Sequence, residues 1–247
     1  MRYPRVRADW RGSGLTAVAV ALVAVLASTV ALAQDAIPAP AFKPGMAWTY
    51  QQREDITGRA VGAVRVEIIA VATDRVTANF TTEGGPTVSE RWDAAGNWEQ
   101  VGTRGWPWLA RLGGKSKRVE FVPALALYRF PLQPGASWVE TVRAVDPDSG
   151  RKTEVKLFAK ALKWEEVNVP AGKFMALKVR RIFTPEDFDE LRSRTTVTLL
   201  DWYSPQVVAS VRSIWDWEHQ DYRRPPGDQL AKGVRTLWEL TAYTSAK

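Results

Sequence analysis

Apolar and polar residues alternate along most of the chain downstream of residue 45. A period of two is typical of strands that bury one face, and turn residues such as Pro170-Ala171-Gly172 separate the runs. We therefore expect about a dozen antiparallel strands joined in meanders. The clearest apolar sets are Val64, Val66 and Ile68; Val155, Leu157 and Ala159; Met175, Leu177 and Val179; and Ala209, Val211, Trp215 and Trp217.

Helix signals are scarce, and only Val122–Tyr128 and Pro185–Arg194 are predicted as short helical segments. A sheet of long strands has to cover its apolar face by curling, by pairing with a second sheet or by accepting a helix. The 12 Trp residues favour curling around a bulky interior. The pattern predicts a mainly β protein: an antiparallel, strongly curved sheet (a half-barrel) with little helix, and room for an apolar ligand at its mouth.

A short repeat divides the sheet into two related hairpin units, 42–102 and 130–183. Phe42-Lys43-Pro44-Gly45-Met46-Ala47-Trp48 matches Leu132-Gln133-Pro134-Gly135-Ala136-Ser137-Trp138, and a Gly-Arg turn follows each copy. The sequence alignment then places Ile68 against Ala159. Duplication of one hairpin and convergence on common turn chemistry both explain the match, and we favour duplication.

The first 33 residues are predicted to be a secretory signal peptide. Four Arg precede an uncharged run from Leu15 to Ala33, which ends in the small-x-small pattern Ala31-Leu32-Ala33. The alternative is an uncleaved anchor, because the run is just long enough to span a bilayer. Cleavage after Ala33 would leave residues 34–247, which we expect to form a single β-rich domain that opens with an extended leader over 34–44.

Composition narrows the classes of function. The formal charge of +7 falls to +4 without the signal peptide, which removes four Arg and one Asp, and no Lys/Arg block dominates; we predict no binding of nucleic acid. An exported chain without Cys suits the bacterial cell envelope, so we predict a periplasmic location. The single His and the absence of Cys exclude a thiolate metal site and any site that needs two imidazoles from one chain.

Catalytic patterns are weak. His219 would be the general base of a serine hydrolase, but the sequence has no Gly-x-Ser-x-Gly motif that would supply the nucleophile. We therefore interpret His219 as a surface residue at the end of a strand. Glu165 and Glu166 are adjacent on a predicted strand, so they face opposite sides and cannot act on one substrate. The acidic stretch Asp187, Asp189 and Glu190 lacks the spacing of a calcium loop, and Gly113-Gly114-Lys115-Ser116 lacks the first Gly of a phosphate loop. We predict neither enzyme activity nor a cofactor or metal.

One segment combines aromatic and basic residues in the manner of a ligand rim. Gly and Pro interrupt it, so it should be able to move, and its basic residues suit an anionic headgroup. Its interpretation as a plug that closes the sheet's open end competes with that of a ligand lid. The predicted ligand-binding residues are Trp106, Trp108, Arg111, Lys115, Lys117 and Arg118.

The stretch Trp164-Glu165-Glu166-Val167-Asn168-Val169-Pro170-Ala171-Gly172-Lys173-Phe174, with Trp202-Tyr203-Ser204-Pro205 downstream, resembles a motif pair of uncharacterised bacterial envelope β-proteins. In those proteins the second motif continues to a Gly, where this chain has Val208 or Ala209. Their architecture is similar to that of lipoprotein carriers of the LolA/LolB kind, and the resemblance implies a cupped antiparallel sheet.

The sequence therefore predicts a non-enzymatic periplasmic protein that binds an apolar or amphiphilic ligand, such as a lipid or acyl chain, in envelope biogenesis. A lipid or lipoprotein ligand and a peripheral contact with the membrane surface are the partners we expect. Two alternatives stay open: an envelope scaffold or interaction protein with a fully packed interior, and a carbohydrate-binding protein that uses exposed Trp. Cavity volume separates the first alternative from ligand binding.

Overall fold

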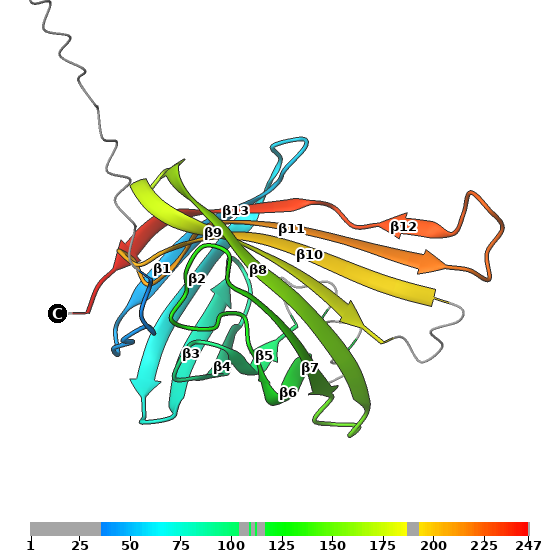
Figure 1. The fold of residues 1–247 in the computed structure, drawn as a ribbon, viewed down its shortest axis with the longest axis horizontal. Helices are drawn as coiled ribbons and strands as arrows, with labels where there is room; N and C mark the ends of the chain where they lie inside the picture. Colours follow the sequence, from blue (N-terminus) through cyan, green and yellow to red (C-terminus); the bar gives the residue numbers. More distant parts are fainter. Residues whose placement is uncertain (1–35, 104–108, 110–111, 113–116, 187–192, 247) are drawn as a thin grey trace, which may run out of the picture. The chain divides into compact units, whose positions relative to one another are not determined.

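The computed structural model describes residues 36–103, 109, 112, 117–186 and 193–246, and these belong to one compact unit (Figure 1). Strands dominate it, as the alternation predicts. Within the described residues the strands are β1 (Ala47–Glu54), β2 (Ala60–Val71), β3 (Arg75–Thr82), β4 (Thr87–Asp93), β5 (Trp98–Gly102), β6 (Arg118–Leu125), β7 (Ser137–Val145), β8 (Lys152–Val169), β9 (Gly172–Pro185), β10 (Ser193–Ser204), β11 (Ala209–Asp221), β12 (Leu230–Lys232) and β13 (Thr236–Thr244). No helix in this part of the chain is long and apolar enough to cross a membrane.

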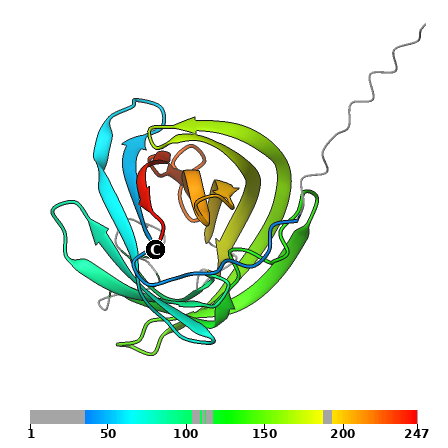
Figure 2. The same cartoon turned by 90° about the vertical axis from the view of Figure 1, so that its left-hand side faces the viewer.

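The sheet is antiparallel and strongly curved, which confirms the predicted fold class, and it curls until it closes. Neighbouring strands pair in sequence order from β1 to β11, and β13 lies between β1 and β11. Figure 2 looks into the resulting barrel from one end. Closure removes the free edges that a half-barrel would leave unpaired.

The closing contact between β11 and β13 is short. It contains four residue pairs, from Arg212 opposite Glu239 to Trp215 opposite Thr236, whereas β10 and β11 share twelve. On its polar face Glu239 accepts hydrogen bonds from Arg212, at 2.7 Å for the closer contact, and from Arg53 on β1. The carboxylate thus connects β11, β13 and β1 at the short pairing that closes the barrel.

Burial follows the predicted alternation at most positions. Val155, Leu157 and Ala159 are buried, while Phe158 lies on the outer face of β8 with 47% exposure. Met175 is an exception to the prediction: its side chain is 37% exposed and Ala176 is buried instead. The register between β8 and β9 shifts between Ala161 and Trp164. A strict alternation of inward and outward side chains does not predict such a shift.

The structure does not show a helix in the described residues of either segment that the sequence predicts as helical. Val122–Tyr128 is not a helix, because its first four residues continue β6, where β7 supplies the backbone partners of Val122. Pro185 ends β9 and Ser193 begins β10, so the ends of the second segment are extended, and residues 187–192 lie outside the described residues. Pro170-Ala171 forms the tight turn between β8 and β9, as predicted, with Val169 opposite Gly172.

The two sequence repeats open with the same turn. Gly45 and Gly135 have φ angles of 86° and 84°, and their N–H groups donate to the carbonyls of Ile68 and Ala161 at 2.8 and 2.9 Å. Only glycine adopts this conformation without steric cost. The sequence alignment of the second strands was wrong by two residues, since Ile68 corresponds to Ala161 and not to Ala159. The β7–β8 hairpin is longer than the β1–β2 hairpin. Trp138 pairs with Ala159 in the former, whereas the equivalent Trp48 pairs with Val66 in the latter.

Residues 36–44 form an extended strap across one end of the barrel (Figure 2). Ile37 pairs with Leu132 through two backbone hydrogen bonds of 2.8 Å. At the other end of the strap, the ring of Phe42 lies 6.4 Å from that of Trp48 and 6.0 Å from that of Trp92. The strap is therefore held by backbone pairing on one side and by aromatic contacts on the other.

Candidate functional site

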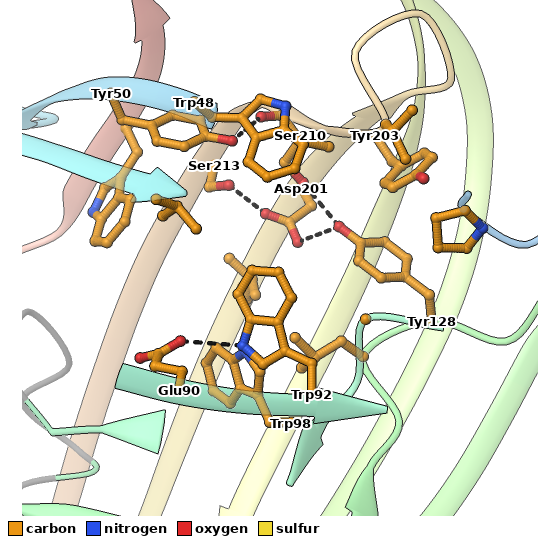
Figure 3. A pocket seen from close by; sticks show the side chains of 18 of the residues that line it. Trp48, Tyr50, Glu90, Trp92, Trp98, Tyr128, Asp201, Tyr203, Ser210 and Ser213 are labelled. Atoms are coloured by element: carbon orange, nitrogen blue, oxygen red, sulfur yellow. Dashed lines mark hydrogen bonds between the residues drawn. The ribbon is translucent and has the colours of Figure 1, made fainter. Parts of the chain in front are cut away.

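A partly enclosed cavity of about 160 Å³ lies inside the barrel beneath the strap (Figure 3). Its walls come from the strap, from β1 to β5, from the β6–β7 connection and from β10, β11 and β13. The barrel brings together residues that are more than 150 positions apart in the sequence. Ten of the 22 described residues that line it are aromatic: Phe42, Trp48, Tyr50, Phe80, Trp92, Trp98, Tyr128, Tyr203, Trp215 and Trp238.

The aromatic rings contact one another and anchor the walls. Trp238 lies 6.2 Å from both Tyr50 and Phe80, measured between ring centroids. The indole N–H of Trp48 donates to the carbonyl of Val207 at 2.7 Å, and the Tyr50 hydroxyl donates to the carbonyl of Ser210 at 3.0 Å. These two bonds tie β1 to the β10–β11 hairpin, with which it does not pair directly, and hold the apolar wall in place.

Asp201 forms the centre of a polar wall. One of its carboxylate oxygens accepts from Ser213, and the other accepts from Arg181 and, at 3.1 Å, from the Tyr128 hydroxyl. Arg181 is completely buried, and its guanidinium also donates to the Leu127 carbonyl and lies 4.2 Å from the Tyr128 ring centroid. The charge of Asp201 is thereby balanced within the protein, and its lone pairs are occupied.

The three tyrosines that line the cavity keep their hydroxyl protons, and Tyr50 and Tyr128 use them to donate hydrogen bonds. Burial raises the pKa of Tyr50, Tyr128 and Tyr203 above the ordinary phenol value. All three hydroxyls therefore stay protonated at physiological pH. Tyr128 also contacts the Ser210 hydroxyl at 2.8 Å, which extends the polar wall along β11.

Glu90 is a second carboxyl in the lining, and it differs from Asp201 in having no cationic partner among the described residues. Its side chain is 3% exposed; one oxygen accepts from the Gly102 N–H at 3.2 Å and the other from the Trp92 indole at 3.1 Å. The Gly102 backbone can approach Glu90 because glycine has no Cβ. A Cβ at this position would lie 2.9 Å from the Val88 side chain, which is too close. Burial raises the pKa of Glu90 to about 7.

The site residues predicted from the sequence lie elsewhere or beyond what is described. Trp106, Trp108, Arg111 and Lys115 lie outside the described residues, and their role stays a prediction. Lys117 is exposed in a turn, and Arg118 is exposed at the start of β6 opposite Gly102; neither lines the cavity.

Two further residues of that segment are described, and they bear on its role. Leu109 and Leu112 are both buried, with 0% and 6% exposure, and belong to the hydrophobic core. Buried leucines at these two positions agree with both interpretations of the segment, because a plug and a lid would each have to pack against the core.

The weaker chemical candidates do not meet in the cavity. His219 lies near the end of β11 and contacts the Thr195 hydroxyl at 2.9 Å. Glu165 accepts from the Trp202 indole at 2.7 Å, which lowers its pKa, whereas Glu166 is exposed. Asp187, Asp189 and Glu190 lie outside the described residues. No group of three or more His, Asp or Glu side chains suited to a metal occurs in the described part of the chain.

Sequence reasoning missed both carboxyls of the cavity, although a signal for each was present. Glu90 lies two residues from Val88 and from Trp92, so all three face the same side of the strand. Asp201 shares a face with Leu199 and Tyr203 in the same way. A lone acidic residue on the apolar side of an alternating strand points into the interior. Such a residue is the strand-pattern signal of a buried charge.

Comparisons with known proteins give no family assignment. The chain matches no family model and no curated protein sequence at a significant level. Among solved structures it is similar to a "putative lipoprotein" from Parabacteroides distasonis, with a TM-score of 0.48 and 16% identity over 84% of this chain and 97% of that one. A "putative exported protein with YmcC-like fold" from Bacteroides fragilis gives 0.47 and 16% over 85% and 98%.

A third similar structure is the "hypothetical lipoprotein YmcC" from Escherichia coli. Its TM-score is 0.39 at 7% identity, with 81% of this chain and 86% of that chain covered. Similarities at these TM-scores carry no argument about function, so any function has to be argued from the residues of the cavity and from the sequence.

Proposed function

We propose that this protein is a non-enzymatic binding protein of the bacterial periplasm that holds an apolar or amphiphilic ligand inside its barrel. The cavity is the observation that carries the proposal. Its lining is largely apolar and rich in aromatic side chains, its volume is about 160 Å³, and a few polar groups are fixed at one wall. Apolar walls with a few oriented polar groups are the usual composition of small-molecule sites.

The size of the cavity limits what it can enclose. An apolar cavity of about 150 Å³ stays dry and admits benzene. A ligand such as a lipid would therefore place one short apolar segment or one compact group inside, while the rest of the molecule lies beyond the strap.

The polar groups of the cavity support binding in preference to catalysis. Ser210 and Ser213 are the hydroxyl nucleophiles among the described lining residues, and their contacts are with Tyr128 and Asp201. Neither of them contacts a His or Lys among the described residues, and a base of this kind usually activates a nucleophilic serine. Asp201 is already paired with Arg181 and accepts from Tyr128 and Ser213, so it orients the polar wall.

The two alternatives make different demands. A scaffold needs no cavity, and carbohydrate binding by tryptophan needs exposed indole rings. All nine Trp residues in the described part of the chain are buried or half-buried. Trp106 and Trp108 lie outside the described residues, so carbohydrate binding would depend on them.

A series of linear alcohols tests the proposal. We expect calorimetric or tryptophan-fluorescence titration of the purified protein with butanol to octanol to show saturable binding. Affinity should rise about fourfold per methylene, which is what about 0.8 kcal/mol of burial gives, until the cavity is full. Ala209→Phe, which fills the cavity, should abolish binding, and Ala70→Phe on the exposed outer face of β2 should not. Absence of saturable binding for every alcohol would contradict the proposal.

Export has its own test. N-terminal sequencing of the protein from its native envelope fraction should find Gln34 as the first residue. Retention of Met1 would mean that the protein is anchored and does not enter the periplasm as a free chain.

A further inference from the structure

The charges around the cavity do not balance. Of the described residues that line it, two are acidic, Glu90 and Asp201, and none is basic. Arg181 neutralises Asp201 from behind the wall. Glu90 is left with two N–H donors, from Gly102 and Trp92, and no ion pair in the described part of the chain.

A buried carboxyl without a counter-ion is costly, and an apolar residue would fit its position on β4. The residue opposite Glu90 on β3 is Ala78, which is completely buried, so the surroundings of Glu90 on that side are apolar. Ionised groups stay buried when a cation or a set of donors compensates them. No described residue supplies a cation to Glu90, so a cationic ligand would complete the site in its ionised form.

The neighbours of Glu90 are suited to a particular kind of cation. Trp92 donates to the carboxylate from the same strand, and Trp98 follows on β5; Figure 3 shows both indoles in the pocket beside Glu90, with Asp201 on the far side. The negative face of an indole attracts cations, most strongly those that are weakly hydrated, such as alkylated ammonium groups. A carboxylate surrounded by tryptophans is the chemistry that recognises such groups.

We infer that the cavity binds a quaternary or alkylated ammonium group, with Glu90 as its counter-ion and Trp92 and Trp98 as the aromatic rings around it. The inference rests on the proposed function and names its ligand class. A trimethylammonium group is compact and apolar on its surface, so it suits a cavity of about 160 Å³. This ligand is opposite in charge to the anionic headgroup that the basic residues of the 106–118 segment suggest.

Titration of Glu90 adds a signature to this site. Its pKa of about 7 means that the carboxyl is protonated in the empty protein below neutral pH. Among the described residues, the other titratable groups that face the cavity are Asp201, Tyr50, Tyr128 and Tyr203, and Arg181 lies behind Asp201. A permanent cation selects the ionised form, so its affinity should rise up to tenfold per pH unit toward pH 7 and level off above it.

Choline and 3,3-dimethyl-1-butanol form the matched pair for the test, because they have the same shape and differ in charge. We expect calorimetric titration of the full-length mature protein at pH 8 to give at least tenfold tighter binding of choline. Glu90→Gln should remove this preference while keeping affinity for the neutral alcohol. Glu120→Gln makes the same change on the exposed pair with Arg91 and should leave the preference intact.

The outcomes separate the inference from the proposed function. Binding of the alcohol without a preference for choline, or a preference that survives in Glu90→Gln, would overturn the inference and leave the binding function standing. Failure of both ligands and of the linear alcohols would overturn the binding function itself. If Glu90→Gln does not fold, the pH dependence of the choline preference in the unmodified protein decides, and a preference that is flat from pH 5.5 to 8 would overturn the inference.

Two sources could supply the ammonium group, and a vesicle experiment distinguishes them. Co-sedimentation with phosphatidylcholine vesicles that depends on Glu90 would support a lipid headgroup. Binding of free choline without such co-sedimentation would support a soluble organic cation. Phosphatidylglycerol vesicles, which lack the ammonium group, serve as the control.

Discussion

The Trp92 indole donates a hydrogen bond of 3.1 Å to the Glu90 carboxylate two residues earlier on β4, and both side chains face the cavity. Residues i and i+2 share a face of a strand, so this contact is set by the local sequence. It fixes the orientation of the indole and of the carboxylate together. The site thus depends on a pair that an alternating strand positions by itself.

The buried Glu90 should make stability depend on pH. Its pKa rises from 4.5 to about 7 on folding, so the folded state favours the protonated form. The stability that protonation contributes is fully present below pH 4.5 and is lost as the pH rises to about 7. Relative to Glu90→Gln, the unfolding free energy of the unmodified protein should fall by about 3 kcal/mol across this range. Denaturant titrations at several pH values check this, and parallel curves for the two proteins would contradict it.

Asp201 should be important for stability because it neutralises Arg181. The Asp201→Asn substitution would leave a completely buried guanidinium without its carboxylate. Removing one partner of a buried ion pair costs about 3–5 kcal/mol. Guanidinium chloride unfolding should show a loss of this order, whereas Asp216→Asn on the exposed face of β11 should change stability by about 0.5 kcal/mol or less. Equal stabilities of the two variants would argue against the pairing.

Glu239 should stabilise the closure of the barrel. Its carboxylate accepts from Arg53 and Arg212 beside the four-pair seam of β11 and β13. Because both arginines are partly exposed, we expect Glu239→Gln to cost about 1–2 kcal/mol. Glu67→Gln, which alters an exposed pair with Arg65 on β2, is the control. Hydrogen exchange should quicken at the seam in the first variant, and unchanged protection there would contradict the role assigned to Glu239.

Val208 should be a strained position. Its φ of 57° lies in the left-handed region, which β-branched residues rarely adopt. The envelope motif that this segment resembles has a Gly here or at the next residue. Val208→Gly should be more stable than Val208→Ala by about 1 kcal/mol, because glycine avoids the steric cost that alanine retains. Thermal unfolding of the two variants provides the comparison, and an alanine variant as stable as the glycine variant would contradict the strain.

Much of the fold could be predicted from the alternation of side chains. The runs around Val155 and Val211 bury the predicted residues, and Pro170-Ala171 forms the predicted turn. Closure could not be predicted, because it depends on the β11–β13 pairing between residues that no local pattern connects. The register shift between Ala161 and Trp164 and the length of the β7–β8 hairpin are likewise properties of strand pairing and not of one strand.

The candidate site was less accessible from the sequence. The cavity joins the strap, β1, β4, β5 and β10, so its composition emerges only when the barrel closes. Glu90 and Asp201 are nevertheless marked in the sequence, because each is an acidic residue at an inward-facing position of an alternating strand. Whether that segment also contacts a ligand stays a prediction that Trp106→Ala with Trp108→Ala can test.

Native mass spectrometry of the protein, gently purified from its own source, tests the central claim most directly. We predict an additional mass that corresponds to a bound small molecule or lipid, and its absence from the cavity-filled variant Ala209→Phe. The Ala70→Phe control should keep that mass. A bare protein mass in all three preparations, together with no uptake of added amphiphiles, would contradict a binding function for the barrel interior.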